Sequence, residues 1–158
     1  MKKYISAVLL SALILCAFCG CSLFKQKPLK ADEYEVKVHI RLDLKEDIGL
    51  LLVNYSADGR KAQGGISNAN KTMLKKNSDD LDWSLYKEFL DTPADTADLT
   101  LKFTVVTKYF EPNYDNDYPE EYMIPMNDIS FAADFGKIYY VTITGDKAGG
   151  YHAVLNGT

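Results

Sequence analysis

The chain has 158 residues, of which 47% are hydrophobic and 25% charged, and its formal net charge is −4. This length corresponds to one domain of ordinary size, and the composition is that of a folded protein rather than a disordered one. Residues 1–20 hold two lysines and no acidic residue, so the rest of the chain has 16 basic residues against 22 acidic ones. An acidic body of this kind argues against nucleic acid as a partner.

The first 20 residues have the pattern of a secretion signal. Lys2 and Lys3 give a positive start, and residues 4–24 carry no charge. A short positive region followed by an apolar segment is typical of a signal peptide. The alternative is an uncleaved membrane anchor helix, because a run of this length just reaches across a bilayer core of about 30 Å. Two serines, a glycine and three cysteines dilute the run, so we favour the signal peptide.

The segment Phe18-Cys19-Gly20-Cys21 ends this apolar run. It resembles the lipobox of bacterial lipoproteins, in which a small residue precedes a cysteine that receives a diacylglyceryl group before cleavage. The resemblance implies that Gly20 is the small residue and that Cys21 is lipidated. Two acyl chains hold a protein stably on a bilayer, whereas one does so only marginally. We therefore expect a mature protein that is anchored to the membrane through Cys21 and faces outside the cytoplasm.

Residues 21–33 are short, contain several lysines and are interrupted by Pro28, which is typical of a tether between an anchor and a domain. All the cysteines of the chain lie at or before Cys21, so the domain beyond the tether is expected to fold without disulfides. A domain of the size of residues 34–158 has enough apolar residues for an ordinary core.

The clearest strand signal lies in residues 34–45. Apolar and polar residues alternate there without interruption, which predicts a strand with one buried face and one wet face. The apolar members are Tyr34, Val36, Val38, Ile40, Leu42 and Leu44.

The next part of the chain is less regular. Residues 48–55 form an apolar run typical of a buried neighbouring strand, and Asp58-Gly59 predicts a turn. Residues 59–80 are rich in Gly, Asn, Lys and Ser, and we expect a loop with one short strand near 72–74. Residues 81–90 fit either a strand or two turns of helix, and a strand is favoured.

Three further segments alternate or are rich in β-branched and aromatic residues: 99–105, 129–135 and 138–144. An acidic and aromatic loop, residues 111–121, separates the first two. A turn over residues 145–150 then predicts a final hairpin that ends in a strand at residues 151–155.

Several short strands without a long amphipathic helix predict an all-β fold, an antiparallel β-sandwich or barrel of about seven or eight strands. The segment from Asp134 to Thr144 resembles the penultimate strand of immunoglobulin-type domains, in which Asp-x-Gly-x-Tyr is common; here the tyrosine, Tyr139, stands one residue later. The resemblance favours an immunoglobulin-like sandwich for residues 34–158 and implies nothing about function.

No pattern in the domain predicts catalysis. His39 and His152 are its histidines, and both lie in predicted strands far apart in the chain. No nucleophile elbow, zinc-binding spacing or phosphate-binding loop is present in the sequence. We therefore expect a protein that is not an enzyme; a carboxylate-based hydrolase accessory domain is the alternative, because a glycosidase needs only a pair of carboxylates at a defined separation.

The loop at 111–121 contains a candidate calcium site. Calcium binds six to eight oxygen ligands on a flexible loop. Asp115, Asn116, Asp117 and Glu120 supply such oxygens. The order of an EF-hand loop is not met, since Tyr118-Pro119 follows Asp117 and no glycine turns the chain. A calcium-stabilised structural module is thus a second alternative.

The same loop carries regularly spaced tyrosines. An exposed tyrosine offers a flat apolar face and a hydroxyl, which suit a sugar ring or a protein surface. The candidate binding patch consists of Tyr114, Tyr118, Tyr122, Trp83 and Tyr86. The sequence therefore favours a lipid-anchored, non-enzymatic binding module for an unidentified protein or glycan.

Overall fold

The computed structural model describes residues 29–158 apart from 92, 114 and 116, and these residues form eight strands. In chain order they are β1 (Glu35–Leu44), β2 (Leu50–Ala57), β3 (Arg60–Ile66), β4 (Leu81–Tyr86), β5 (Thr96–Val106), β6 (Met123–Asp134), β7 (Ile138–Asp146) and β8 (Gly150–Gly157). Two short 3-10 helices, η1 (Lys87–Phe89) and η2 (Glu120–Tyr122), follow β4 and precede β6. The predicted signal peptide and Cys21 lie outside the described residues.

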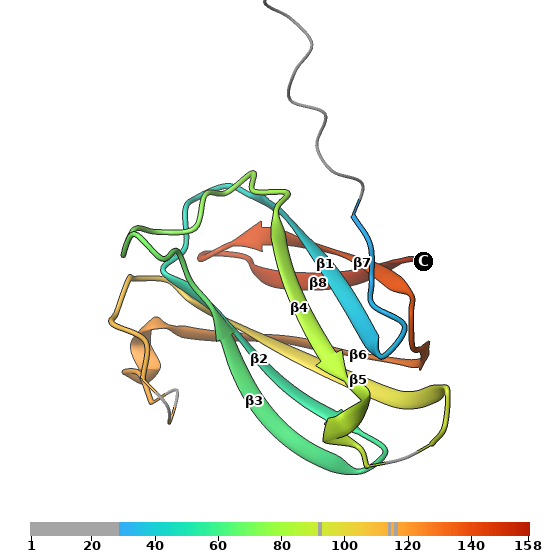
Figure 1. Ribbon diagram of the computed structural model, residues 1–158. Coiled ribbons are helices and arrows are strands. Elements are labelled where there is room, and N and C mark those ends of the chain that lie inside the picture. The colour runs from blue at the N-terminus through green and yellow to red at the C-terminus, as the bar shows by residue number, and fades with distance from the viewer. Residues whose placement is uncertain (1–28, 92, 114, 116) are drawn as a thin grey trace, which may run out of the picture.

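The strands form two sheets that pack face to face, as Figure 1 shows. One sheet has the order β4-β1-β7-β8 and the other the order β3-β2-β5-β6. The predicted all-β sandwich is therefore confirmed. In the part of the chain that the structure describes, no helix is long and apolar enough to cross a bilayer.

The prediction of a purely antiparallel sandwich is wrong for one pair of strands. β1 runs parallel to β7, with Lys37 opposite Ile138 and Leu44 opposite Gly145. The alternating pattern of residues 34–45 defines which side chains face the core, but it carries no information about the direction of a neighbouring strand. Of the strands that follow β1 and precede β7, only β4 belongs to the same sheet as β1, and the others form the second sheet. The chain then returns to the first sheet at the end where β1 starts, so β7 runs in the same direction as β1.

The core lies between the sheets and follows the alternation of the strands. The inward-facing residues of β1, namely Val36, Val38, Ile40, Leu42 and Leu44, are all buried. Phe103 of β5 is the largest of the fully buried side chains and packs among them. A continuous apolar layer of this size can hold a domain together without disulfides.

A second, smaller apolar cluster lies on the outer face of the β3-β2-β5-β6 sheet. Leu50, Leu52 and Val106 point away from the main core and are covered by the segment 107–122, chiefly through Tyr118. Gly49 permits this cover, because a Cβ atom at that position would lie 2.0 Å from the carbonyl oxygen of Lys108. The covering segment therefore passes directly against the start of β2.

Residues 59–81 differ from the prediction. The expected loop contains β3, which pairs antiparallel with β2 along its whole length. The short strand expected near 72–74 is only an isolated bridge between Leu74 and Ile48. Residues 81–90 form the favoured strand as far as Tyr86. The single 3-10 turn η1 then follows, in place of the alternative of two helical turns.

The two sheets are joined at the edge where β6 meets β8. The pairing of β5 with β6 shifts by one residue between Lys102 and Thr104, which is a β-bulge. In β6, beside this shift, the side chain of Asn127 donates from Nδ2 to the Ala153 carbonyl at 2.9 Å and accepts from the Ala153 N–H at 3.1 Å. The side-chain amide of Asn127 thus takes the place of a neighbouring strand and pairs the backbone N–H and C=O of Ala153 at the edge of β8.

Candidate binding surface

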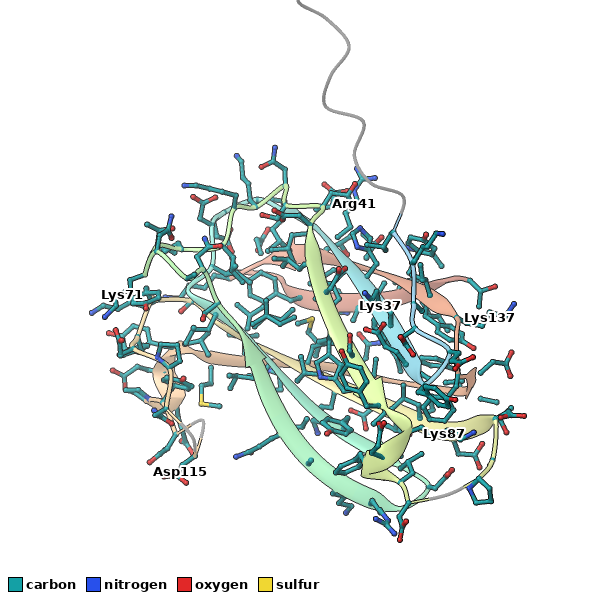
Figure 2. The ribbon with its side chains drawn as sticks, in the orientation of Figure 1. Lys37, Arg41, Lys71, Lys87, Asp115 and Lys137 are labelled. Atoms are coloured by element: carbon teal, nitrogen blue, oxygen red, sulfur yellow. The ribbon has the colours of Figure 1, made fainter. Side chains whose placement is uncertain are left out.

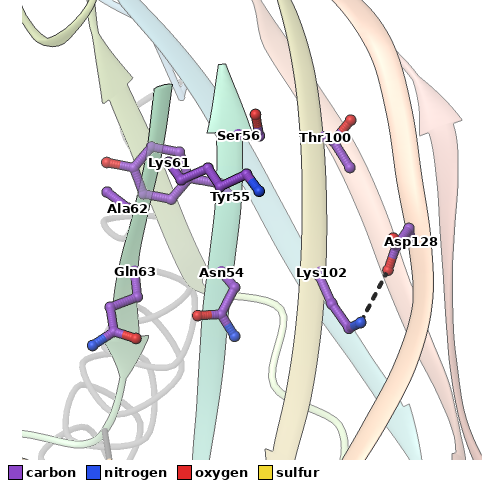
Figure 3. Close-up of a pocket in the computed structure, with 9 residues that line it drawn as sticks. All are labelled: Asn54, Tyr55, Ser56, Lys61, Ala62, Gln63, Thr100, Lys102 and Asp128. Atoms are coloured by element: carbon purple, nitrogen blue, oxygen red, sulfur yellow. Dashed lines mark ion pairs between the residues drawn. The ribbon is translucent and has the colours of Figure 1, made fainter. Parts of the chain in front are cut away.

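Polar side chains gather on the outer face of the β3-β2-β5-β6 sheet, beyond the part that segment 107–122 covers. The register places them in rows across the four strands, because directly paired residues share a face. The first row is Gln63, Asn54, Lys102 and Asp128, and the second row is Lys61, Ser56, Thr100 and Ser130. Figure 3 shows the first row complete and most of the second.

This surface is hollowed, with a volume of about 470 Å³. The residues that line it, called the polar hollow below, are Asn54, Tyr55, Ser56, Lys61, Ala62, Gln63, Thr100, Lys102 and Asp128. Its volume falls within the range of about 300–1,000 Å³ that is usual for small-ligand sites. Most of the lining residues carry an amide, hydroxyl or charged group, although apolar atoms make up the larger part of the surface that they expose.

The polar hollow is only partly satisfied by its own contacts. Lys102 Nζ lies 3.9 Å from Asp128 Oδ1, and both side chains are about half exposed, so this ion pair is weak. Thr100 Oγ1 hydrogen-bonds Ser130 Oγ at 2.8 Å. Within the described residues, by contrast, no hydrogen bond or ion pair is made by the side chains of Asn54, Ser56 and Lys61. These three groups are available to a ligand.

Tyr55 lines the polar hollow from β2, but its ring lies on the inner face of the sheet, as its partner Leu101 does. Its ring packs edge-on against Trp83, with the centroids 4.8 Å apart, and also contacts Phe89. Burial raises the pKa of Tyr55, so its hydroxyl stays neutral well above physiological pH. This aromatic packing lies beneath the polar hollow, on the inner face of the sheet, and joins β2 to β4 and η1.

The loop that the sequence analysis singled out lies beside the polar hollow. Gln63 Nε2 donates to the carbonyl oxygen of Asp115 at 3.2 Å. A second hollow of about 230 Å³ continues along β3, between the loop and the two leucines of the smaller cluster. Gln63 lines both hollows, so the loop and the polar face form adjoining surfaces.

The predicted tyrosine patch is not a single exposed surface. Tyr118 is only 6% exposed, and its hydroxyl accepts a hydrogen bond from the N–H of Asn113. Phe110 contacts the rings of both Tyr118 and Tyr122, so these two tyrosines belong to the cover over β2. Tyr114 lies outside the described residues.

The other two aromatic residues of that patch lie on β4, in the opposite sheet. Trp83 is partly buried against Tyr55 between the edge strands β3 and β4. Tyr86 is 53% exposed at the end of β4. The structure therefore separates Trp83 and Tyr86 from Tyr118 and Tyr122.

The candidate calcium ligands are exposed on the loop. Asp115, Asp117 and Glu120 all face solvent, and Asn116 lies outside the described residues. Figure 2 shows Asp115 at the tip of this loop, away from the labelled lysines Lys37 and Lys137. Among the residues that can be placed, no three or more acidic, His or Cys side chains gather as a metal site. Calcium binding stays a prediction.

His39 occupies a separate hollow of about 280 Å³ on the outer face of the other sheet. Its Nδ1 lies 2.8 Å from Asp82 Oδ1 and its Nε2 lies 3.4 Å from Asp79 Oδ1. Both ring nitrogens thus face carboxylates, and the ring packs edge-on against Tyr140. This arrangement ties β1 to β4 and to the segment before it, while His152 lies exposed on β8.

Sequence reasoning missed the polar hollow because its residues come from four different strands. The available signal was the change along β2 from an apolar run to Asn54 and Ser56, and the lysine and threonines on one face of β5. Only the strand register shows that these residues are neighbours.

Comparison with known proteins adds little. No protein-family model matches the chain, and no curated protein matches it. A non-hemolytic pneumolysin from Streptococcus pneumoniae strain ST306 is similar over 78% of this chain, with 9% identity and a TM-score of 0.33. The alignment covers 24% of the pneumolysin chain, and a likeness this slight carries no argument about function.

Proposed function

We propose that this chain is a lipid-anchored, extracytoplasmic lipoprotein that is not an enzyme and whose sandwich binds a protein or glycan. The anchor part of the proposal rests on the positive start, the uncharged run and the segment Phe18-Cys19-Gly20-Cys21. A diacylglyceryl group on Cys21 would then hold the domain against the outer side of the membrane.

The binding part of the proposal rests on one observation, the polar hollow. A β-sheet face that needed only to be soluble would be served by long charged side chains. This face instead presents Asn54 and Ser56, short polar groups without partners among the described residues, on a strand that pairs with β3 on one side and with β5 on the other. Preformed, rigid polar groups are what a binding surface requires, because little entropy is lost when a ligand engages them.

We further propose that the sandwich is immunoglobulin-like. Support comes from the turn between β6 and β7, where the Tyr139 hydroxyl accepts a hydrogen bond of 2.7 Å from the N–H of Asp134. A tyrosine whose hydroxyl bonds the backbone a few residues upstream is a feature of that fold, the tyrosine corner. Tyr139 is also the tyrosine that carries the sequence resemblance.

The anchor is tested by growing cells that express the full chain with an alkyne-labelled fatty acid. We expect the wild-type protein to be labelled and to sediment with membranes. Cys21→Ala should abolish the label and release or mislocalise the protein, whereas the matched control Cys16→Ala should keep the label. A label that survives Cys21→Ala would show that the anchor is assigned wrongly.

The binding role is tested with the acylated full-length protein in liposomes. We expect these liposomes to bind purified cell-envelope material from the source cell, and Asn54→Ala with Ser56→Ala to lower that binding at least fivefold. Binding that is unchanged in the double variant would remove the polar hollow from the proposal.

A further inference from the structure

We infer that the polar hollow binds a glycan segment that carries an acidic group, with the sugar hydroxyls at Asn54, Ser56 and Thr100 and the acidic group at Lys61. This inference deepens the proposed function and rests on it only for the location of the site. It commits to one of the two ligand classes that the sequence left open.

The hydrogen-bonding groups match those of a sugar. A sugar hydroxyl both donates and accepts, and so do the amide of Asn54 and the hydroxyls of Ser56 and Thr100. Asn54 and Ser56 lie on the same strand two residues apart, so their side chains share a face about 6–7 Å apart along the strand. Asn54 and Ser56 can therefore contact two neighbouring sugar units of one glycan at the same time.

The charge of the polar hollow favours an acidic group. Lys102 is offset by Asp128, but Lys61 has no acidic partner among the described residues. Lys61 lies directly opposite Ser56 in the register, and Figure 3 shows its amine reaching across toward that residue. An uncompensated ammonium thus stands beside the free hydroxyl of a domain that is otherwise acidic, which is complementary to a carboxylate or phosphate on the ligand.

The same surface does not suit a protein partner. Stable protein interfaces centre on a desolvated cluster of aromatic, Met or Arg side chains surrounded by a polar rim. Tyr55 is the aromatic residue in the lining, and its ring is already engaged by Trp83 and Phe89. The lining thus offers no free aromatic ring as an anchor. We therefore expect the ligand to be recognised through hydrogen bonds and charge, and its binding to be weak and sensitive to salt.

The test uses the acylated full-length protein, displayed on liposomes to compensate for weak single-site affinity, on an array of acidic oligosaccharides and their neutral counterparts. The array carries uronic-acid and phosphorylated sugars with the corresponding uncharged sugars. We expect binding to acidic members, at least tenfold weaker at 0.5 M salt than at about 0.15 M. Lys61→Ala should lower this binding about tenfold, and Lys61→Arg should preserve it. Asn54→Ala should weaken the binding of every glycan that the wild-type protein binds.

Lys137→Ala is the matched control, since Lys137 is an exposed lysine in the turn between β6 and β7. It should bind as the wild type does, and all variants should melt at the wild-type temperature because the substituted side chains are at the surface. No glycan bound, binding to neutral sugars alone, or binding that Lys61→Ala leaves unchanged would each overturn the inference. Envelope binding that persists without any glycan binding would overturn it while leaving the proposed binding module intact.

Discussion

Glu35 is a buried charged residue. It lies on the face of β1 that the alternation of apolar and polar residues assigns to solvent. It is 5% exposed and accepts hydrogen bonds from the Ser84 hydroxyl and from the N–H of Asp32. Burial alone would raise the pKa of Glu35, but these two donors and the nearby Lys37 outweigh it and lower the pKa below its usual value of 4.5. In its ionised form the Glu35 carboxylate therefore links the start of β1 to Ser84 of β4 and to Asp32.

This lowered pKa predicts acid sensitivity. A carboxyl group with a lower pKa in the folded state stabilises the fold above its unfolded pKa, and that stability is lost as the pH falls below about 4.5. Glu35→Gln should reduce the free energy of unfolding by about 1–2 kcal/mol at pH 7, and the difference from wild type should shrink below pH 4. Urea unfolding at both pH values measures this, with exposed Asp43→Asn as the control. A constant difference at both pH values would contradict it.

Gly49 supports a second prediction at the residue scale. A methyl group there would overlap the Lys108 backbone, which has no flexible end to move aside. Gly49→Ala should therefore destabilise the fold by about 1–3 kcal/mol and loosen the cover formed by Phe110, Tyr118 and Tyr122. Thermal melts and the near-ultraviolet circular dichroism of these aromatic rings would report both effects.

Gly64→Ala is the matched control, because its Cβ would meet Trp83 Nε1 at 3.9 Å, an ordinary contact. It should change stability far less than Gly49→Ala. Equal effects of the two substitutions would show that close approach of segment 107–122 is not what requires Gly49.

At the scale of elements, the strands that can be predicted from the sequence are those with one face on the core and the other in solvent. β1, β5 and β7 alternate because one side faces the core, and the pattern is readable without any partner. β3 was missed because Gly64 and Gly65 have no side chains to alternate and because it is an edge strand with largely exposed residues. The ring of Trp83, from the other sheet, lies close to Gly64. The glycine that suggested a loop in the sequence therefore leaves space for this ring.

Strand direction and the polar hollow were unpredictable for a related reason. Alternation assigns a side chain to a face but does not say which strand lies next to it. Asn54, Lys61 and Lys102 become neighbours only through the register of β2 with β3 and β5. Residues 111–121 suggested a binding patch in the sequence because their tyrosines are close together in the chain, yet Tyr118 is buried against Leu50 and Leu52 of β2.

The bridge between β6 and β8 gives a prediction at this scale. Asn127 both donates to and accepts from Ala153, and a carboxylate can only accept. Asn127→Asp should leave the Ala153 carbonyl without its partner and cost about 1–2 kcal/mol. Hydrogen exchange at β8 should accelerate more than exchange at β2. The neighbouring exposed change Asp128→Asn keeps the bridge, and a similar loss of protection in that variant would contradict the assignment.

At the scale of the whole molecule, the proposed binding surface and the residues that lead into β1 lie on different sheets. Residues 29–34 lead into β1, which is an inner strand of the β4-β1-β7-β8 sheet, whereas the polar hollow lies on the outer face of the other sheet. Figure 1 shows the chain entering the domain on the side of β1, across the sandwich from β2 and β3. A domain held at its N-terminus would thus keep the polar hollow turned away from its attachment point.

The parallel pairing of β1 with β7 also determines when the domain can become complete. The two strands are separated by nearly the whole domain, and closing so long a loop costs chain entropy before the new contacts repay it. Folds rich in such distant contacts form slowly. A chain that has emerged only as far as β6 leaves one side of β1 unpaired, so the sandwich cannot close until the C-terminal hairpin arrives. Under the export that we propose, such late closure would leave the chain still unfolded, the state in which a polypeptide can pass through a narrow channel.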